Sequence, residues 1–227
     1  MGPAGPPHIS ICAELATKLD DTTVSLVSYP LAPNSPAPTT VPQLLKLYHA
    51  LLAESAAAKE KVVFVGDSAG GNLCLTLPLT ALNQDTHARC PASIMLISPC
   101  VDPRNDHPKT LEIEKAGVDP LLSIAFADGC SGKWRGEWSL SDPRLSALDA
   151  DLSVLKRRGI RVHGVYGHYD ILSPNVTVFK DKCNSLGISG EWLEWDKQMH
   201  IFPLFWELGL SEAVTAKDWI LAVLGRE

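Results

Sequence analysis

A short apolar run, followed at once by a glycine-flanked serine and then by a helical pattern, constrains this chain more than any other feature. Residues 61–65 read Lys-Val-Val-Phe-Val, which is typical of a strand covered on both faces in a parallel sheet. Gly66-Asp67-Ser68-Ala69-Gly70 follows, and we expect a helix from about residue 72 to residue 82, kinked at Pro78. A G-x-S-x-G string between a strand and a helix predicts a serine nucleophile at the edge of a sheet.

This turn makes steric and electrostatic demands on its neighbours. We expect a strained backbone at Ser68, and we expect glycine to be required at Gly66 and Gly70 because strand and helix approach closely there. The N–H of Ala69 lies at the start of the helix, where the positive end of the helix dipole can stabilise a developing oxyanion. The turn therefore predicts both a nucleophile and one donor of an oxyanion hole.

Two other origins of such a string have to be considered. A glycine-rich turn can hold a serine that has no chemical role. Chymotrypsin-type proteases carry their nucleophile in a similar string, but their fold is all-β and their histidine and aspartate precede the serine. Here helices alternate with strands and candidate partners follow Ser68, which argues against that class.

Apolar runs of strand length alternate with helical patterns along the chain. Besides residues 61–65, we expect strands at 23–29, 93–98, 159–166 and 191–195, and helices at 9–19, around 44–52, and at 175–185 and 213–224. This alternation predicts one α/β domain over residues 1–227, with a mostly parallel sheet and helices on both faces.

Residues 104–156, called the cap segment below, interrupt this alternation. The segment is too long for an ordinary connection, and we expect it to form a cap inserted over the site. The alternative is a disordered surface excursion, although the aromatic and leucine content is high for disorder. Its apolar residues either line a pocket for substrate or pack within the cap: Leu121, Phe126, Trp134 and Trp138.

A serine hydroxyl becomes a useful nucleophile when a histidine takes its proton and a carboxylate orients that histidine. Asp170 follows the strand ending at Tyr166 and is the expected acid, and His200 follows the next strand on a loop and is the expected base. This gives the order serine, acid, histidine that α/β-hydrolases share. The remaining histidines fit less well, because they precede the acid: His8, His49, His87, His107, His163 and His168.

Composition excludes several other classes. The net charge of −6 and the scattered lysines and arginines offer no basic surface for nucleic acid. No run of about 18 apolar residues predicts a transmembrane segment. The six cysteines have no C-x-x-C spacing, so we expect no metal site. The first residues do not resemble a signal peptide, so a cytoplasmic location is expected. Oligomeric state is not predicted.

With these residues in place, the chain resembles the hormone-sensitive-lipase-like esterases, also called the α/β-hydrolase fold-3 family. The resemblance covers nearly the whole chain. It implies hydrolysis of small carboxylic esters of modest acyl length through an acyl-enzyme, with no metal or organic cofactor. It is carried by Tyr29-Pro-Leu-Ala-Pro33, similar to the family's Tyr-Arg-Leu-Ala-Pro, by residues 66–71, Ser98-Pro99, the stretch from Asp142-Pro143 to Leu152, Asp170, and His200 with Phe202.

One motif of that family is absent from this sequence. Members carry His-Gly-Gly-Gly on a loop upstream of the part that matches residues 9–19, and its N–H groups supply most of the oxyanion hole. The chain begins where that loop would end, so the first strands of the usual sheet are also expected to be missing. Either Met1 is an internal methionine of a longer protein, or the chain is a shortened relative with impaired turnover.

Three functions remain open from the sequence. The first is a serine esterase acting through Ser68, His200 and Asp170. The second is a non-catalytic relative that holds a small ligand, and the missing loop motivates it. The third is an acyltransferase, which uses the same three residues with an alcohol or amine in place of water.

Overall fold

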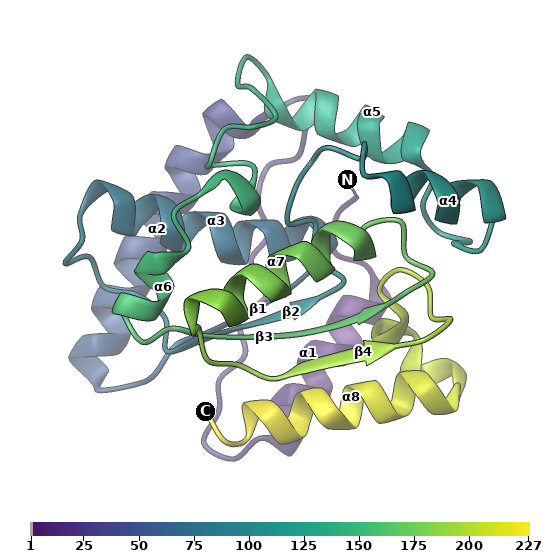
Figure 1. The fold of residues 1–227 in the computed structure, drawn as a ribbon. Coiled ribbons are helices and arrows are strands. Elements are labelled where there is room, and N and C mark those ends of the chain that lie inside the picture. The colour runs from purple at the N-terminus through teal and green to yellow at the C-terminus, as the bar shows by residue number, and fades with distance from the viewer. Residues whose placement is uncertain (1) are drawn as a thin grey trace.

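The computed structural model describes residues 2–227, and its centre is a four-stranded, wholly parallel sheet in the order β1-β2-β3-β4 (Figure 1). Each neighbouring pair is parallel, and Gly66 of β1 lies opposite Leu96 of β2, which lies opposite Gly164 of β3. The strands are β1 (Val63–Asp67), β2 (Ser93–Ile97), β3 (Arg161–Gly167) and β4 (Trp192–Trp195). All carboxyl ends therefore meet at one edge, where residues that follow the strands gather.

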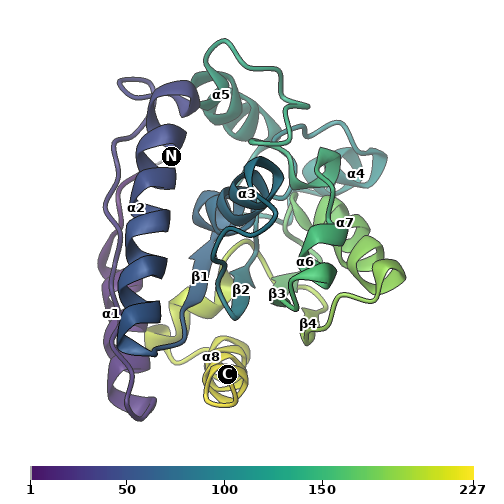
Figure 2. The same cartoon turned by 90° about the vertical axis from the view of Figure 1, so that its left-hand side faces the viewer.

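Helices cover both faces of the sheet, which confirms the predicted α/β class (Figure 1; Figure 2). Successive residues of β2 enter different cores: Leu96 packs with α3 and α7, and Met95 packs with α1 and α8. No helix within residues 2–227 combines the length and apolar character needed to cross a membrane. The helices of the two layers and their 3-10 turn are α1 (Pro6–Lys18), α2 (Ala37–Ala58), α3 (Ser68–Gln84), α7 (Ser173–Leu186), η2 (Phe202–Leu208) and α8 (Ser211–Leu224).

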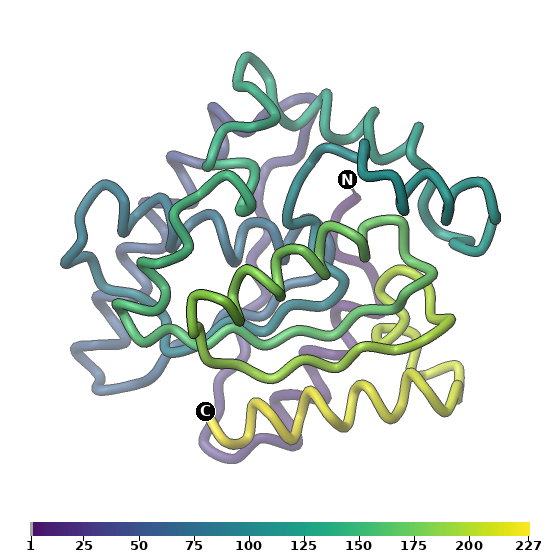
Figure 3. Tube along the Cα trace, in the orientation of Figure 1, coloured from purple at the N-terminus to yellow at the C-terminus, as the bar shows by residue number. Residues whose placement is uncertain are grey.

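The strand predicted at residues 23–29 is wrong. This segment runs without regular structure between α1 and α2 (Figure 2; Figure 3). Strands need a hydrogen-bonded neighbour, and among the described residues β1 pairs only with β2, so nothing completes a ladder here. Leu26 and Val27 are consequently 50% and 42% exposed, despite their strand-like composition.

Other elements differ from expectation at their ends. Helix α3 begins at Ser68 itself, four residues earlier than expected, and continues as one helix through Pro78. The immediate passage from β1 to α3 leaves no loop between Asp67 and Ser68. The serine therefore occupies the first position of a helix.

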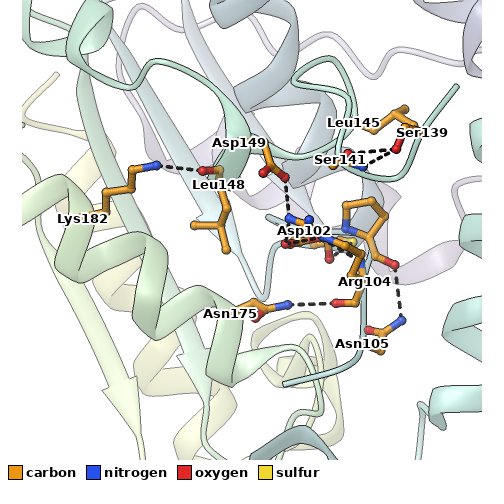
Figure 4. A network of polar contacts seen from close by, with 12 residues as sticks. Asp102, Arg104, Asn105, Ser139, Ser141, Leu145, Leu148, Asp149, Asn175 and Lys182 are labelled. Atoms are coloured by element: carbon orange, nitrogen blue, oxygen red, sulfur yellow. Dashed lines mark hydrogen bonds and ion pairs between the residues drawn. The ribbon is translucent and has the colours of Figure 1, made fainter. Parts of the chain in front are cut away.

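The cap segment folds into helices joined to the α/β layers by hydrogen bonds. It contains α4 (Pro108–Ala116), α5 (Ile124–Arg135), η1 (Ala147–Asp149) and α6 (Ser153–Arg157), with α4 and α5 toward the end of the sheet at which the strands finish (Figure 1). At its base, the Arg104 guanidinium binds the carboxylates of Asp102 and Asp149 (Figure 4). Asn175 of α7 donates to the Arg104 carbonyl at 3.0 Å. These bonds connect the cap segment to Asp102, in the segment after β2, and to α7.

Candidate active site

The turn between β1 and α3 holds Ser68 in the left-handed region, with φ +49°. A Cβ at Gly66 would lie 2.6 Å from the carbonyl atoms of Gly70 and 2.7 Å from Cys74 Sγ. Such distances are far below van der Waals contact, so Gly66 permits the close approach of strand and helix. The Ser68 carbonyl also accepts the N–H of Cys100 at 2.9 Å, which fixes the turn against the segment after β2.

The steric requirement expected at Gly70 is not found. A Cβ there would meet no atom within 4 Å among residues 2–227, apart from the neighbouring backbone of its own helix. The second tight glycine is Gly71, where a Cβ would lie 2.8 Å from the Pro99 side chain. Gly70 enters the close approach only through its backbone carbonyl, which a Cβ at Gly66 would meet.

The structure brings together the three residues predicted as nucleophile, base and acid. Nε2 of His200 lies 2.9 Å from Ser68 Oγ, and Nδ1 lies 2.8 Å from Asp170 Oδ2. Asp170 is fully buried and His200 is 3% exposed. With Nδ1–H donated to the carboxylate, Nε2 is free to accept the serine proton. The three side chains thus form a continuous hydrogen-bonded relay across 132 residues of sequence.

The loops that carry Asp170 and His200 are bonded to each other through their backbones. The N–H of Tyr169 donates to the Gln198 carbonyl at 3.0 Å. A Cβ at Gly167 would lie 2.1 Å from that same carbonyl oxygen, so only glycine allows the two loops to meet. The second oxygen of Asp170 accepts the Leu172 N–H at 2.8 Å. The Asp170 carboxylate is therefore oriented by a backbone hydrogen bond as well as by its contact with His200.

Ser98 supports the histidine loop, a role that the sequence reasoning missed. Its Oγ accepts the N–H of Ile201 at 3.0 Å, and Ile201 directly follows His200. Both residues have positive φ, +44° for Ser98 and +46° for Ile201. The available signal was the position of Ser98 directly after β2, since residues after parallel strands meet at one edge.

Charge around the relay favours protonated histidine. Burial is the largest single effect and lowers the pKa of His200, but the charge and hydrogen bond of Asp170 together with the charges of Asp119 and Asp67 outweigh it. The net result is a pKa above the ordinary histidine value. The carboxylates would therefore stabilise the imidazolium that forms when Ser68 loses its proton.

The Ala69 N–H lies in the first turn of α3, directly after the serine. N–H groups in the first turn of a helix have no acceptor within that helix, and they lie at the positive end of its dipole. Ala69 is therefore available to donate to an oxyanion formed on a carbonyl attacked by Ser68.

His8, a weaker candidate in the sequence, lies next to the turn. Its Nδ1 accepts the Gly5 N–H at 3.0 Å, so Nε2 carries the proton and points at Asp67 Oδ2, 3.4 Å away. The hydrogen bond with Asp67 raises the pKa of His8 despite partial burial. Asp67 thus connects the turn to α1.

The aromatic residues of the cap segment divide between packing and exposure. Trp134 is 7% exposed and packs with Val41 of α2 and Leu73 of α3. Phe126 and Leu121 are 58% and 42% exposed. Of the two roles considered for the apolar residues of the cap segment, lining a pocket or packing, Trp134 therefore has the packing role.

Nowhere in the described chain do three or more His, Cys, Asp or Glu side chains gather as metal ligands. A hollow of about 400 Å³ lies where β1 and β2 begin, and its lining includes Lys61, Cys90 and Arg158 but none of the relay residues. The candidate active site is the relay at the opposite edge of the sheet.

Comparison with known proteins agrees with this architecture. The family model described as alpha/beta hydrolase fold matches residues 4–204. An esterase of Acinetobacter venetianus is 28% identical over 203 residues, covering 87% of this chain and 62% of that protein. Human hormone-sensitive lipase is 31% identical over 117 residues, covering 48% of this chain and 10% of that protein. The chain thus spans less than two thirds of these relatives.

Solved structures extend the likeness to the fold. A hormone-sensitive lipase from a metagenome library has a TM-score of 0.84 at 23% identity, covering 98% of this chain and 72% of that one. EstE7, a homologue of hormone-sensitive lipase from a metagenome library, has a TM-score of 0.81 at 25% identity, covering 95% and 70%. The chain belongs to the α/β-hydrolase fold family, in its hormone-sensitive-lipase-like group.

Proposed function

We propose that this chain is a carboxylic ester hydrolase of the serine type, acting on small esters of modest acyl length without a metal or organic cofactor. The observation that carries the proposal is the relay from Ser68 through His200 to Asp170, with contacts of 2.9 and 2.8 Å. The names of the relatives, an esterase and a lipase, support the same class.

The reaction proceeds in two halves. Ser68 Oγ attacks the ester carbonyl as its proton passes to His200 Nε2, and the Ala69 N–H stabilises the oxyanion. The alcohol leaves with the proton from His200, which gives an acyl-serine. Water then gives its proton to His200 and its hydroxyl to the acyl carbon, and the acid is released as the proton returns to Ser68. Asp170 stays ionised and stabilises the histidinium in both halves.

The cap segment has a separate proposed role as a cover over this site. Its helices α4 and α5 lie at the carboxyl edge of the sheet, the edge that also carries the relay (Figure 1). A cover at that edge would exclude bulk water from the acyl-enzyme and limit the size of the acyl group.

A fluorophosphonate probe tests the proposal directly, because it reacts with an activated serine. The purified chain is treated with the probe, and the modified residue is located by mass spectrometry. We expect labelling at Ser68, loss of labelling in S68A, and a decrease of at least about 10³-fold in labelling rate in H200A. A p-nitrophenyl ester assay then follows turnover.

The control is S141A, which removes an exposed cap-segment serine whose hydroxyl lies 2.9 Å from that of Ser139, and this variant should label as the wild type does. A folded wild-type chain that is not labelled would contradict the proposal and would favour a relative that only binds a small ligand. Labelling at equal rates in wild type and H200A would contradict the assignment of the base.

A further inference from the structure

The residue that follows Asp170 is held on both sides by the cap segment. The N–H of Ile171 donates to Asp119 Oδ2 at 3.2 Å, and its carbonyl accepts the Thr110 hydroxyl at 3.0 Å. Thr110 lies in α4 and is 1% exposed, and Asp119 lies between α4 and α5. The backbone N–H and the backbone carbonyl of Ile171 are therefore both hydrogen-bonded to side chains of the cap segment.

Asp119 also organises its own loop. Its Oδ1 accepts the N–H groups of Leu121 and Leu122 at 3.0 and 3.2 Å. Burial raises the pKa of this carboxyl, the nearby charge of Asp170 adds to that effect, and the three N–H donors oppose it. One half-buried carboxylate thus links the loop before α5 to the loop that carries the acid.

Ile171 lies between Asp170 and Leu172, two residues that are hydrogen-bonded to each other. Asp170 Oδ1 accepts the Leu172 N–H at 2.8 Å, so the carboxylate is bonded to the backbone just beyond Ile171, and Oδ2 of the same carboxylate lies 2.8 Å from His200 Nδ1. A rotation of the Ile171 peptide would tilt this carboxylate relative to the imidazole. Positioning groups of this kind determine how often a relay is in its reactive geometry.

We propose that Asp119 is a positioning residue of the active site, through which the cap segment orients the Asp170–His200 pair and adds negative charge behind it. This inference rests on the proposed function for its catalytic meaning. It also makes a prediction about His200 that does not depend on turnover.

The charge part of the inference concerns the groups that face His200. Three carboxylates act on it: Asp170 in direct contact, Asp67 at the end of β1, and Asp119 from the cap segment. The Ser68 hydroxyl faces Nε2, and Asp67 is in turn shared with His8. Of the three carboxylates, Asp119 is the one supplied by the cap segment. Neutralising it should lower the pKa of His200 while leaving the direct contact with Asp170 in place.

The test uses the full 227-residue chain with isotopically labelled histidine, and follows the His200 ring by NMR through a pH titration. In D119N, which keeps the size and one oxygen acceptor, we expect the His200 titration to move to lower pH. In T110V, which removes the other bond to Ile171 without a charge, the titration should stay in place. The rate of fluorophosphonate labelling should fall about fivefold in each variant, as one hydrogen bond is lost or weakened. T110S, which keeps the hydroxyl, should restore the rate.

A His200 titration in D119N that coincides with that of the wild type would overturn the inference. If D119N does not fold, D119S, which keeps an oxygen acceptor without the charge, is measured in the same way. A shifted titration in a chain whose Ser68 is never labelled would support the effect of the Asp119 charge on His200 and contradict the esterase proposal. Labelling of Ser68 at the wild-type rate in D119N, with an unshifted His200 titration, would support the esterase proposal and contradict the role of Asp119.

Discussion

The contrast between Gly66 and Gly70 gives the sharpest test of the turn that positions Ser68. Both are glycines of the G-x-S-x-G string, but their surroundings differ. A Cβ on Gly66 would lie 2.6 Å from backbone atoms of Gly70 and 2.7 Å from Cys74 Sγ, whereas a Cβ on Gly70 would meet nothing within 4 Å in the described chain. The two alanine variants should therefore change stability in opposite directions.

The size of each effect follows from these distances. Carbon atoms in contact normally lie about 3.5–4.0 Å apart, so G66A would force β1 and α3 apart by about 1 Å. Overpacking costs about 1–3 kcal/mol, and we expect the upper end, about 3 kcal/mol, because two of the clashing atoms are backbone. In G70A, alanine replaces glycine within a helix and should stabilise by about 0.5–1 kcal/mol.

Guanidinium unfolding, followed by the fluorescence of the six tryptophans and by circular dichroism, measures both changes. Thermal unfolding of the same variants adds a second measure: a free-energy change of 1 kcal/mol shifts the Tm of a domain of this size by about 2–4 °C, so we expect a fall of about 6–12 °C in G66A and a rise of about 1–4 °C in G70A. Equal midpoints for the two variants would refute the argument, because the close approach at Gly66 would then not govern the turn.

Three further substitutions test contacts around the candidate active site and at the beginning of β3. H8A removes the histidine that pairs with Asp67, a contact that raises the pKa of His8. The stabilisation from this contact is therefore present below the ordinary histidine pKa and is lost as the pH rises through the pKa of the folded state. We expect H8A to lower the free energy of unfolding by less than about 1 kcal/mol at pH 5.5, and by a smaller amount at pH 8.5. S98A leaves the Ile201 N–H without its acceptor and should cost about 1–3 kcal/mol in denaturant unfolding, with an unchanged midpoint contradicting the bond. E227A removes a 5% exposed carboxylate that forms an ion pair with Arg161 and lies 3.2 Å from His163 Nε2, both in β3, and we expect a loss of about 1–2 kcal/mol that weakens in high salt.

The local parts of this structure were predictable because their signals are local. The apolar run before Gly66 and the helical pattern after Ser68 predict a strand and a helix without knowledge of the rest of the chain. The order of Ser68, Asp170 and His200 along alternating strands predicts that they meet, since parallel strands end at one edge. The structure brings their side chains within hydrogen-bonding distance.

The parts that were missed depend on partners distant in sequence. Residues 23–29 have the composition of a strand, but strand formation needs a neighbour, and composition does not supply one. Which glycine is sterically required depends on Pro99, 28 residues beyond Gly71. The bond from Ile201 to Ser98 crosses 103 residues, and the bond from Ile171 to Asp119 crosses 52. Such contacts leave no periodic pattern in the sequence.

The strained residues of the site are stabilised by bonds between the elements that carry them. Non-glycine residues with positive φ cost about 1–3 kcal/mol each and persist where their surroundings fix them. Ser68 is fixed by the close approach at Gly66 and by the Cys100 N–H. The N–H of Ser98 donates to the Val165 carbonyl of β3 at 2.8 Å, and the Ser98 hydroxyl in turn accepts the Ile201 N–H. Each strained residue therefore depends on a neighbouring strand or on the segment that follows one. The relay geometry should consequently form only when β1, β2 and β3 are paired, and loosening one of these bonds should reduce stability and reactivity together.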